Sequence, residues 1–317
     1  MNVIKAEFSE EQSMFNGILP VWKAKGMTSH DVVFKLRRIL KMKKIGHTGT
    51  LDPEVEGVLV ICLGNATKLV EIIMDSDKIY QGEITLGIST ETEDAHGAVV
   101  DQVPVLAPVQ TELIDQKMAA FKGWVTQVPP YYSAVKVNGR KLYEYARAGE
   151  TVDRPQRQVM VEHFKRTSEP VFDAGKHIQQ WQFEVKCGKG TYVRTLAVDL
   201  GQALGYPSHM SQLTRTASGG FTGEEAYTLE AIQQLMDENQ VESILHPLSS
   251  ALEGLPALEL TKSQFVDVTY GKVLPADYFA SPVLEPTVLY YDQTVKAIYQ
   301  PHPTREGFIK PDKMFLS

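Results

Sequence analysis

Apolar and polar residues alternate along several stretches of the chain, with the period of two that is typical of half-buried strands. In one stretch Tyr80, Gly82, Ile84 and Leu86 alternate with polar residues, so Tyr80 is expected to point to the apolar side. The continuous apolar run 58–62 predicts a strand buried on both faces. Together the patterns predict strands at about 17–22, 58–62, 80–86, 158–166 and 177–187, and one that follows Phe121 and runs through Val128.

Helical periodicity appears between these strands. Val32, Leu36 and Leu40 share one face of a helix that Thr28 or Ser29 can cap. The helix predicted at 142–148 should end at Gly149, since glycine readily adopts the left-handed conformation found at helix ends. The predicted helices lie at about 28–42, 65–74, 111–121, 142–148, 191–204 and 228–237, where Asn65, Thr111 and Thr191 are the expected caps of the second, third and fifth.

This order of elements predicts an α+β fold rather than a repeating βαβ fold. We expect a mixed, largely antiparallel sheet with flanking helices in residues 17–254. Short strand-like runs after residue 255 predict a small β-rich domain over 255–317. Residues 1–16 are polar and weakly patterned, and we interpret them as a flexible lead-in.

The net charge of −7 argues against a nucleic-acid partner, but its distribution changes the picture. Residues 1–50 carry a balance of +5 and residues 122–215 a balance of +6, whereas 51–121 and 216–317 carry −10 and −8. The basic segments fit an RNA-facing surface, and they equally fit ordinary solvated faces. Charge alone leaves both readings open.

Composition limits the cellular setting. No apolar run approaches the ~20 residues of a membrane helix, and we find no export signal, so we expect no membrane association and a cytoplasmic protein. Cys62 and Cys187 lie in apolar runs without a Cys or His cluster, which indicates buried thiols rather than a disulfide or a metal site. The acids of 90–97 lack EF-hand spacing, so we expect no metal there.

The loop Gly46-His47-Thr48-Gly49-Thr50-Leu51-Asp52-Pro53 is the best candidate for chemistry. It would present one imidazole and one carboxylate at the end of a buried strand, although these residues also form ordinary surface turns. Six basic side chains within 35–44 lead into it and suit contacts to a phosphate backbone. A solvated helix face is the alternative for any one of them.

Seven motifs occur in an order that resembles the TruB family of tRNA pseudouridine synthases. The family usually has proline where Ala24 and Val60 stand, which concerns loop rigidity rather than chemistry. The motifs, within about 17–221, are Lys25-Gly26-Met27-Thr28-Ser29-His30-Asp31, the loop above, Ile61-Cys62-Leu63-Gly64-Asn65-Ala66-Thr67-Lys68, Asp75-Ser76-Asp77-Lys78-Ile79-Tyr80, Thr90-Glu91-Thr92-Glu93-Asp94-Ala95-His96-Gly97, Pro129-Pro130-Tyr131-Tyr132-Ser133-Ala134-Val135-Lys136 and Cys187-Gly188-Lys189-Gly190-Thr191-Tyr192-Val193-Arg194-Thr195.

The resemblance implies isomerisation of uridine 55 in the T loop of tRNA, with no cofactor and no metal. It implies Asp52 as the nucleophile and Arg194 as its partner. It makes Tyr80 a stacking platform, or the base that removes the C5 proton. The implied substrate-binding residues are His47, Tyr80, Tyr192 and Leu213. By position, 255–317 resembles a PUA-type RNA-binding domain, and nothing in the sequence requires more than a monomer.

The chemistry of the reaction suits these residues. A carboxylate nucleophile divides the isomerisation into steps through a covalent intermediate. A guanidinium keeps such a carboxylate ionised in a water-poor pocket, and its planar fork fits a carboxylate. Removing a base from its stack costs on the order of a few kcal/mol. Stacking on an aromatic ring returns about 1–3 kcal/mol, a comparable amount.

Two other functions fit part of the sequence. A non-catalytic RNA-binding module would use the same basic patches, and detection of pseudouridine separates it from a synthase. A phosphotransferase with an aspartyl nucleophile is the second alternative. Glu54 stands where such an enzyme has a second Asp, and magnesium dependence is the discriminating observation.

Overall fold

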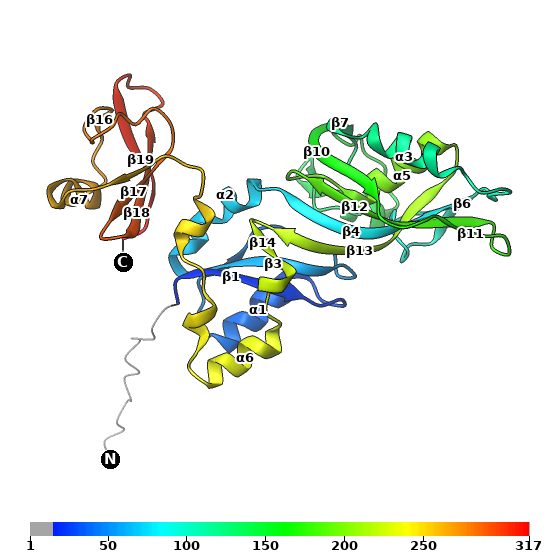
Figure 1. Ribbon diagram of the computed structural model, residues 1–317, viewed down its shortest axis with the longest axis horizontal. Coiled ribbons are helices and arrows are strands. Elements are labelled where there is room, and N and C mark those ends of the chain that lie inside the picture. The colour runs from blue at the N-terminus through cyan, green and yellow to red at the C-terminus, as the bar shows by residue number, and fades with distance from the viewer. Residues whose placement is uncertain (1–14, 317) are drawn as a thin grey trace, which may run out of the picture.

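The computed structural model describes residues 15–316, and it is built around one large mixed sheet (Figure 1). The strand order is β1-β3-β13-β4-β12-β10-β7, with β2, β11 and β14 paired at its sides. The strands are β1 (Gly17–Lys23), β2 (Ile45–His47), β3 (Glu56–Leu63), β4 (Lys78–Leu86), β7 (Gly123–Gln127), β10 (Arg157–Arg166), β11 (Val171–Asp173), β12 (Ile178–Cys187), β13 (Ser208–Ser218) and β14 (Phe221–Thr222).

Neighbouring strands of this sheet are antiparallel except at its centre. Within the described residues, β13 meets β3 in parallel, with Arg215 opposite Gly57. Gly57 has a φ of +123°, and a Cβ on it would lie 2.2 Å from Arg215 O. Only glycine therefore allows the two strands to approach so closely at this point.

The helices cover the sheet in two groups. Helices α1 and α6 pack beside β1 and β3, whereas α3 and α5 pack over β10, β12 and β13 (Figure 1). The α-helices and 3-10 helices (η) are α1 (Ser29–Ile39), η1 (Gly64–Leu69), α2 (Val70–Asp75), α3 (Thr111–Ala119), α4 (Leu142–Ala148), α5 (Val193–Leu204), η2 (Gly223–Glu225), α6 (Leu229–Asp237), η3 (Val241–Ile244), η4 (Leu248–Ala251) and α7 (Lys262–Thr269).

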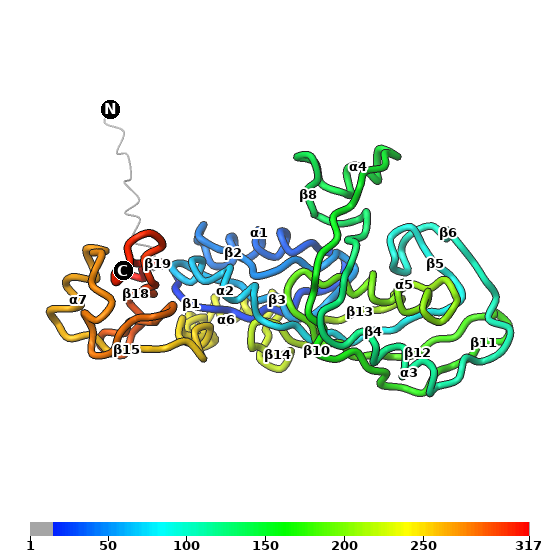
Figure 2. The backbone as a smooth tube through the Cα atoms, turned by 90° about the horizontal axis from the view of Figure 1, so that it is seen from above, coloured from blue at the N-terminus to red at the C-terminus, as the bar shows by residue number. Residues whose placement is uncertain are grey.

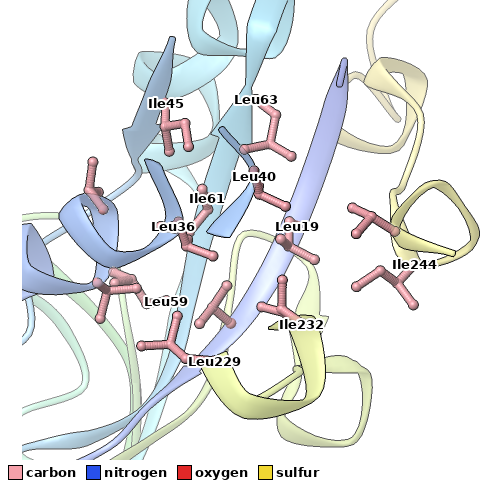
Figure 3. Close-up of a cluster of buried hydrophobic side chains, with 14 of the residues drawn as sticks. Leu19, Leu36, Leu40, Ile45, Leu59, Ile61, Leu63, Leu229, Ile232 and Ile244 are labelled. Atoms are coloured by element: carbon pink, nitrogen blue, oxygen red, sulfur yellow. The ribbon is translucent and has the colours of Figure 1, made fainter. Parts of the chain in front are cut away.

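Three apolar clusters form the core of this region. The first joins one face of β1 and β3 to α1 and α6, with Leu19, Leu36 and Ile232 fully buried (Figure 3). The second lies between α3, α5 and the strands β4, β10 and β12. The third covers the opposite face of β1 and β3. The side chains of Tyr80 and Leu213 pack against both the first and the second cluster, so they lie between the two helix groups.

A second, five-stranded sheet forms the C-terminal part, in the order β15-β17-β18-β19-β16. It encloses a cluster of its own with α7, and it also contributes Val288, Ile298 and Phe315 to the third cluster. The large sheet and the small one therefore share part of their cores. The strands are β15 (Ala257–Glu259), β16 (Leu274–Pro275), β17 (Thr287–Tyr291), β18 (Thr294–Pro301) and β19 (Phe308–Met314).

Two small hairpins extend from the large sheet. One pairs β5 (Ile88–Thr90) with β6 (Val99–Gln102), and the other pairs β8 (Lys136–Val137) with β9 (Arg140–Lys141). The second hairpin and α4 project from the body of the molecule, as Figure 2 shows. Helix α4 ends at Gly149 with a φ of +67°, as the sequence predicts.

The predicted fold class is confirmed: the protein is α+β, with a mixed sheet and a small β-rich C-terminal domain. The border at 254/255 stays a prediction. Of the predicted lead-in 1–16, only Phe15 and Asn16 lie within the described residues. Phe15 packs against the first cluster, and Asn16 Oδ1 accepts from the N–H of Asn65 at 2.8 Å.

Three predicted helix caps are wrong. Gln110, one residue before Thr111, caps α3. Asn65 lies inside η1, and Thr191 Oγ1 donates to Gly188 O at 3.0 Å instead of capping α5. Asn65 Oδ1 accepts from Lys44 Nζ at 3.2 Å, so the side chains of Asn65 and Thr191 are both engaged elsewhere, which a local pattern could not reveal.

Candidate active site

Asp52 lies in the loop between β2 and β3, and its neighbours fix this loop. Leu51 and Val55 are buried in the first cluster. The N–H of Leu51 donates to Ser29 Oγ at 2.9 Å, and the N–H of Val55 donates to Asp52 O at 3.1 Å. The Asp52 side chain is 45% exposed. The loop thus presents a carboxylate to solvent while its backbone is held by the core.

Lys23, at the end of β1, holds the other side of this loop. Its Nζ donates to Ala24 O at 3.1 Å, Met27 O at 2.8 Å and Pro53 O at 3.1 Å. Burial lowers the pKa of Lys23 to about 8, and the field of Asp52 opposes that shift. Three carbonyl acceptors favour the ammonium form, so Lys23 is charged at pH 7. Sequence reasoning missed Lys23, although it follows a predicted buried strand directly.

Arg194 reaches Asp52 from the first turn of α5. Its Nη2 lies 3.1 Å from Asp52 Oδ2, and its side chain is 7% exposed. Nη1 donates to Thr92 O at 2.8 Å, and Nη2 donates to Tyr132 O at 2.9 Å. Asp94 Oδ2 lies 4.0 Å from Nη1. A cation at a helix N-terminus opposes the helix dipole, and the two carboxylates with the two carbonyls offset that penalty.

The planar shape of the Arg194 guanidinium had led us to expect two hydrogen bonds to the Asp52 carboxylate. The structure shows contact through one nitrogen only. Only Nη2 approaches the carboxylate, because the two carbonyls occupy the other directions. These carbonyls belong to two separate loops, 90–97 and 129–135. The planar group therefore joins both loops to the Asp52 loop, which a single ammonium could not do in the same geometry.

A cavity of about 330 Å³ opens beside this ion pair. Its walls come from the Asp52 loop, β4, β13, the 188–192 turn and the start of α5. The lining brings together five of the six residues that the family resemblance implies: Asp52, Tyr80, Tyr192, Arg194 and Leu213. Segments far apart in the sequence therefore converge on one pocket.

His47 does not line this cavity. It lies at the end of β2, where its Nδ1 accepts from the N–H of Gly49 at 3.3 Å. Its ring meets His30 edge-on, with 5.3 Å between the ring centroids. Burial lowers the pKa of His47, and the neighbouring His30 and Arg215 lower it further. The imidazole is therefore neutral at pH 7.

Tyr80 and Leu213 lie on the neighbouring strands β4 and β13 of the large sheet. In register, Tyr80 is opposite Arg215, and Leu213 is opposite Gly82. Burial raises the pKa of the Tyr80 phenol, and the field of Arg215 opposes that shift. The apolar side predicted for Tyr80 is the side that faces the cavity. Both side chains therefore pack against the core and line the cavity at the same time.

Two buried cations that sequence reasoning missed also line the cavity. Arg215 is 1% exposed, and its guanidinium donates to Val58 O at 2.7 Å and Gly49 O at 3.2 Å. Lys78 is 6% exposed and donates to Met74 O at 2.6 Å. Burial lowers the pKa of Lys78 to about 8. Neither forms an ion pair within the described residues, so this end of the pocket is electropositive. The alternation that placed Tyr80 also places Lys78 on its face.

The acidic segment 90–97 has a structural explanation. Thr92 Oγ1 donates to Asp94 Oδ1 at 2.7 Å, and the N–H of His96 donates to the same oxygen at 2.9 Å. Thr195, next to Arg194, donates to Glu93 Oε2 at 2.9 Å. The segment thus forms a braced turn that supports Arg194. Among residues 15–316 we find no group of His, Cys, Asp or Glu side chains arranged to hold a metal ion.

Two family models and several solved structures match this chain. The N-terminal domain of the TruB family pseudouridylate synthases matches residues 37–193, and the tRNA pseudouridylate synthase B C-terminal domain matches residues 194–253. A crystal structure of a Cbf5-Nop10-Gar1 complex superposes with a TM-score of 0.69 at 26% identity, covering 94% of this chain and 84% of that one. An H/ACA RNP bound to a substrate RNA containing 2′-deoxyuridine has the same fold, with a TM-score of 0.69 at 24% identity over 95% and 85% of the two chains.

The fold and these matches define a pseudouridylate synthase. Proteins named tRNA pseudouridine synthase B from Halalkalibacterium halodurans and Staphylococcus haemolyticus are 48% and 49% identical to this chain. The alignments cover 95% of this chain in both cases, and 98% and 100% of the two relatives. The chain belongs to the TruB family. It is an isomerase that converts uridine in tRNA to pseudouridine.

No helix in the described part of the chain combines the length and the apolar character needed to cross a membrane. The two cysteines, Cys62 and Cys187, are free thiols and buried, in agreement with the sequence.

Proposed function

We propose that this protein isomerises uridine 55 in the T loop of tRNA and that Asp52 is the nucleophile. The observation that carries the assignment is the 3.1 Å contact between Arg194 Nη2 and Asp52 Oδ2 at the mouth of the cavity. The almost fully buried guanidinium compensates the negative charge of Asp52 when a nucleotide displaces water from the pocket. Asp52 is then available to form a covalent bond to the nucleotide.

The reaction is balanced without any external reagent. The N1–C1′ bond of the uridine breaks, the base turns, and a C5–C1′ bond forms. A proton leaves C5, and N1 ends up protonated. Cleavage of N1–C1′ moves negative charge onto the detached base. The cations Lys78 and Arg215 at the cavity favour that charge, since electrostatic stabilisation is strongest in a water-poor site.

The remaining site residues receive roles in holding the displaced nucleotide. Tyr80 either offers its ring as a stacking platform or acts as the base that removes the C5 proton once the nucleotide lies against it. Tyr192 and Leu213 line the same cavity. Neutral His47 lies outside the lining and contacts the RNA that the nucleotide has left. Its hydrogen bond from Gly49 fixes the ring for this contact.

The proposal extends to the whole chain. Residues 17–254 act as the catalytic domain and 255–317 as a PUA-like domain, on a protein that works as a monomer in the cytoplasm without a metal or cofactor. The T arm of tRNA is the part of the substrate that enters the cavity. The match of the C-terminal family domain to residues 194–253 supports a unit that ends near residue 254.

Mapping of pseudouridine on a defined tRNA tests the proposal. Purified protein is incubated, without added metal, with an unmodified tRNA transcript and with the same transcript carrying cytidine at position 55. We expect pseudouridine at position 55 of the first RNA and none in the second. Pseudouridine elsewhere in the first RNA would refute the choice of uridine. Binding without any pseudouridine would favour the RNA-binding module instead.

A further inference from the structure

A second hollow lies away from the catalytic cavity, where the large sheet meets the C-terminal domain. Its volume is about 580 Å³, and its walls come from the end of α1, the segment 43–46, η1, α2 and β19. In Figure 2, β2 and α2 lie between α1 and the strand β19 of the C-terminal domain. We call this hollow the basic seam. Its charged lining residues are Arg37, Lys43, Lys44, Lys68, Lys313 and the single acid Glu71.

The cations of the basic seam are poorly compensated. The side chains of Arg37 and Lys43 make no ion pair or hydrogen bond with the described residues. Lys44 donates to Asn65 Oδ1 at 3.2 Å, and Lys68 donates to the carbonyl of Met314. Both of those partners are neutral. Five like charges around one hollow repel each other, in a chain whose net charge is −7, unless an anion occupies it.

The electrostatics of Lys68 agree with this crowding. Its pKa is lowered by burial and by the nearby charge of Lys44. Lys313 is only 18% exposed, and its one acidic neighbour, Asp312, is 3.8 Å away. The seam thus offers several ammonium groups at close quarters. That arrangement suits an extended polyanion with several phosphates better than a single carboxylate.

The position of the seam connects it to the reaction loop. Lys44 is followed directly by β2, which ends at His47, and a strand rises about 3.3 Å per residue. The seam therefore begins about 10 Å along the chain from the histidine that precedes the Asp52 loop. One short strand therefore joins the seam to the loop that carries Asp52.

The C-terminal domain carries less negative charge than the balance of the C-terminal third suggests, so it repels RNA less. The −8 of residues 216–317 is concentrated in 216–254, which carries seven acidic and no basic side chains. Residues 255–317 carry six basic and seven acidic side chains, a balance of −1. Lys313 of this domain faces the seam, and the bond from Lys68 to Met314 fixes β19 there.

We propose that the basic seam binds phosphate groups of the tRNA backbone, and that both domains contribute to the contact through Lys43 and Lys313. The inference rests on tRNA as the substrate and not on which uridine is modified. Lys68 holds β19 in place, whereas the side chain of Lys43 makes no hydrogen bond or ion pair with the described residues and is free to reach a phosphate. The seam therefore contributes to affinity and positions the RNA, but takes no part in the chemical step.

The test compares the variants Lys43→Gln, Lys313→Gln and their combination with the native protein. Lys122→Gln on the catalytic domain and Lys262→Gln on the C-terminal domain are matched controls, since both lysines are exposed and outside the seam. The probe is one unmodified tRNA transcript, and its Kd is measured at several salt concentrations. Each seam variant should weaken binding about three- to tenfold at low salt and reduce the slope of log Kd against log salt by about 0.7–0.9.

At saturating tRNA the seam variants should keep the kcat of the native protein, with the loss appearing in KM. Seam variants that match the controls in Kd and in salt slope would overturn the inference. So would a fall in kcat at unchanged Kd. A native protein that binds tRNA without modifying uridine 55 would refute the proposed function, while the binding measurements would still decide on the seam. Unchanged melting temperatures verify that the variants are folded.

Discussion

At the scale of single residues, the site depends on how the guanidinium of Arg194 is held. It contacts one carboxylate oxygen and two backbone carbonyls from two loops. The sequence motif led us to expect the pairing with Asp52. It could not reveal Thr92 O or Tyr132 O as partners, because a backbone carbonyl leaves no signature in the residue type. Lys23, Lys78 and Arg215 were missed for the same reason, since their partners are also carbonyls.

Arg194→Lys tests the need for a planar group. An ammonium cannot reach Asp52 and both carbonyls at once, so we expect kcat to fall by about 10²–10³, the loss typical of removing one preorganised donor. The Kd for tRNA should change only a few-fold. Arg305→Lys, an exposed position in the C-terminal domain, is the control. Near-native turnover by Arg194→Lys would show that charge alone suffices.

Lys78→Met tests the buried charge through pH. The pKa of Lys78 is about 8 in the folded protein, against 10.5 in the unfolded chain. Between these values the unfolded chain binds more protons, so the contribution of Lys78 to stability rises with pH from 8 to 10.5. The free energy of unfolding of the native protein, relative to Lys78→Met, should therefore increase by about 2 kcal/mol from pH 7 to pH 10. A difference that does not vary with pH would contradict the lowered pKa of Lys78 in the folded protein.

At the scale of elements, hydrophobic periodicity predicted most strands and helices. It failed where a strand or a helix end depends on contacts with residues far away in the sequence. The strand β13 was not predicted, because its half-buried residues include Ser211, Thr214 and Thr216, which carry no apolar pattern. At the start of α5, the side chain of Gln127 binds both the N–H and the carbonyl of Tyr192, at 3.0 and 3.1 Å. A residue 65 positions away thus holds the backbone of the N-cap residue Tyr192, and α5 has no side-chain cap of the kind that the sequence suggested.

The start of α1 allows stability to be separated from catalysis. Thr28 caps the helix, with its Oγ1 accepting from the N–H of Asp31 at 3.1 Å, whereas Ser29 Oγ accepts from the N–H of Leu51 beside Asp52. Thr28→Ala and Ser29→Ala should each lower the free energy of unfolding by about 1 kcal/mol, measured by denaturant titration. Only Ser29→Ala should also lower kcat. Equal kcat values for the two variants would show that the hydrogen bond between Ser29 and Leu51 does not contribute to the rate of the reaction.

At the scale of the whole molecule, the two sheets share an apolar cluster. Phe315, Val288 and Ile298 of the C-terminal domain pack in the same cluster as Ile18 and Val60 of the large sheet. The sequence predicted two units from their patterns, but it gave no sign of this shared core. Contacts between distant segments depend on how the sheets pack, which periodicity within one segment does not encode.

Phe315→Ala tests the coupling between the domains. Phe315 is 4% exposed, so its truncation should lower the free energy of unfolding by about 3–5 kcal/mol. Leu284→Ala, at a side chain that is 78% exposed in the same domain, should have little effect. We expect the native protein to unfold in one transition, with the same midpoint by tryptophan fluorescence and by circular dichroism. Two separate transitions of the native protein would show that the shared cluster does not couple the domains.

The central claim is that the carboxylate of Asp52 attacks the nucleotide. The most direct measurement is tritium release from tRNA labelled at C5 of uridine, compared between the native protein, Asp52→Asn and the exposed control Asp101→Asn. The amide has nearly the same shape but is not a nucleophile, so Asp52→Asn should release no tritium while its Kd for tRNA stays near the native value. Asp101→Asn should behave as the native protein does. Near-native release by Asp52→Asn would contradict the assignment.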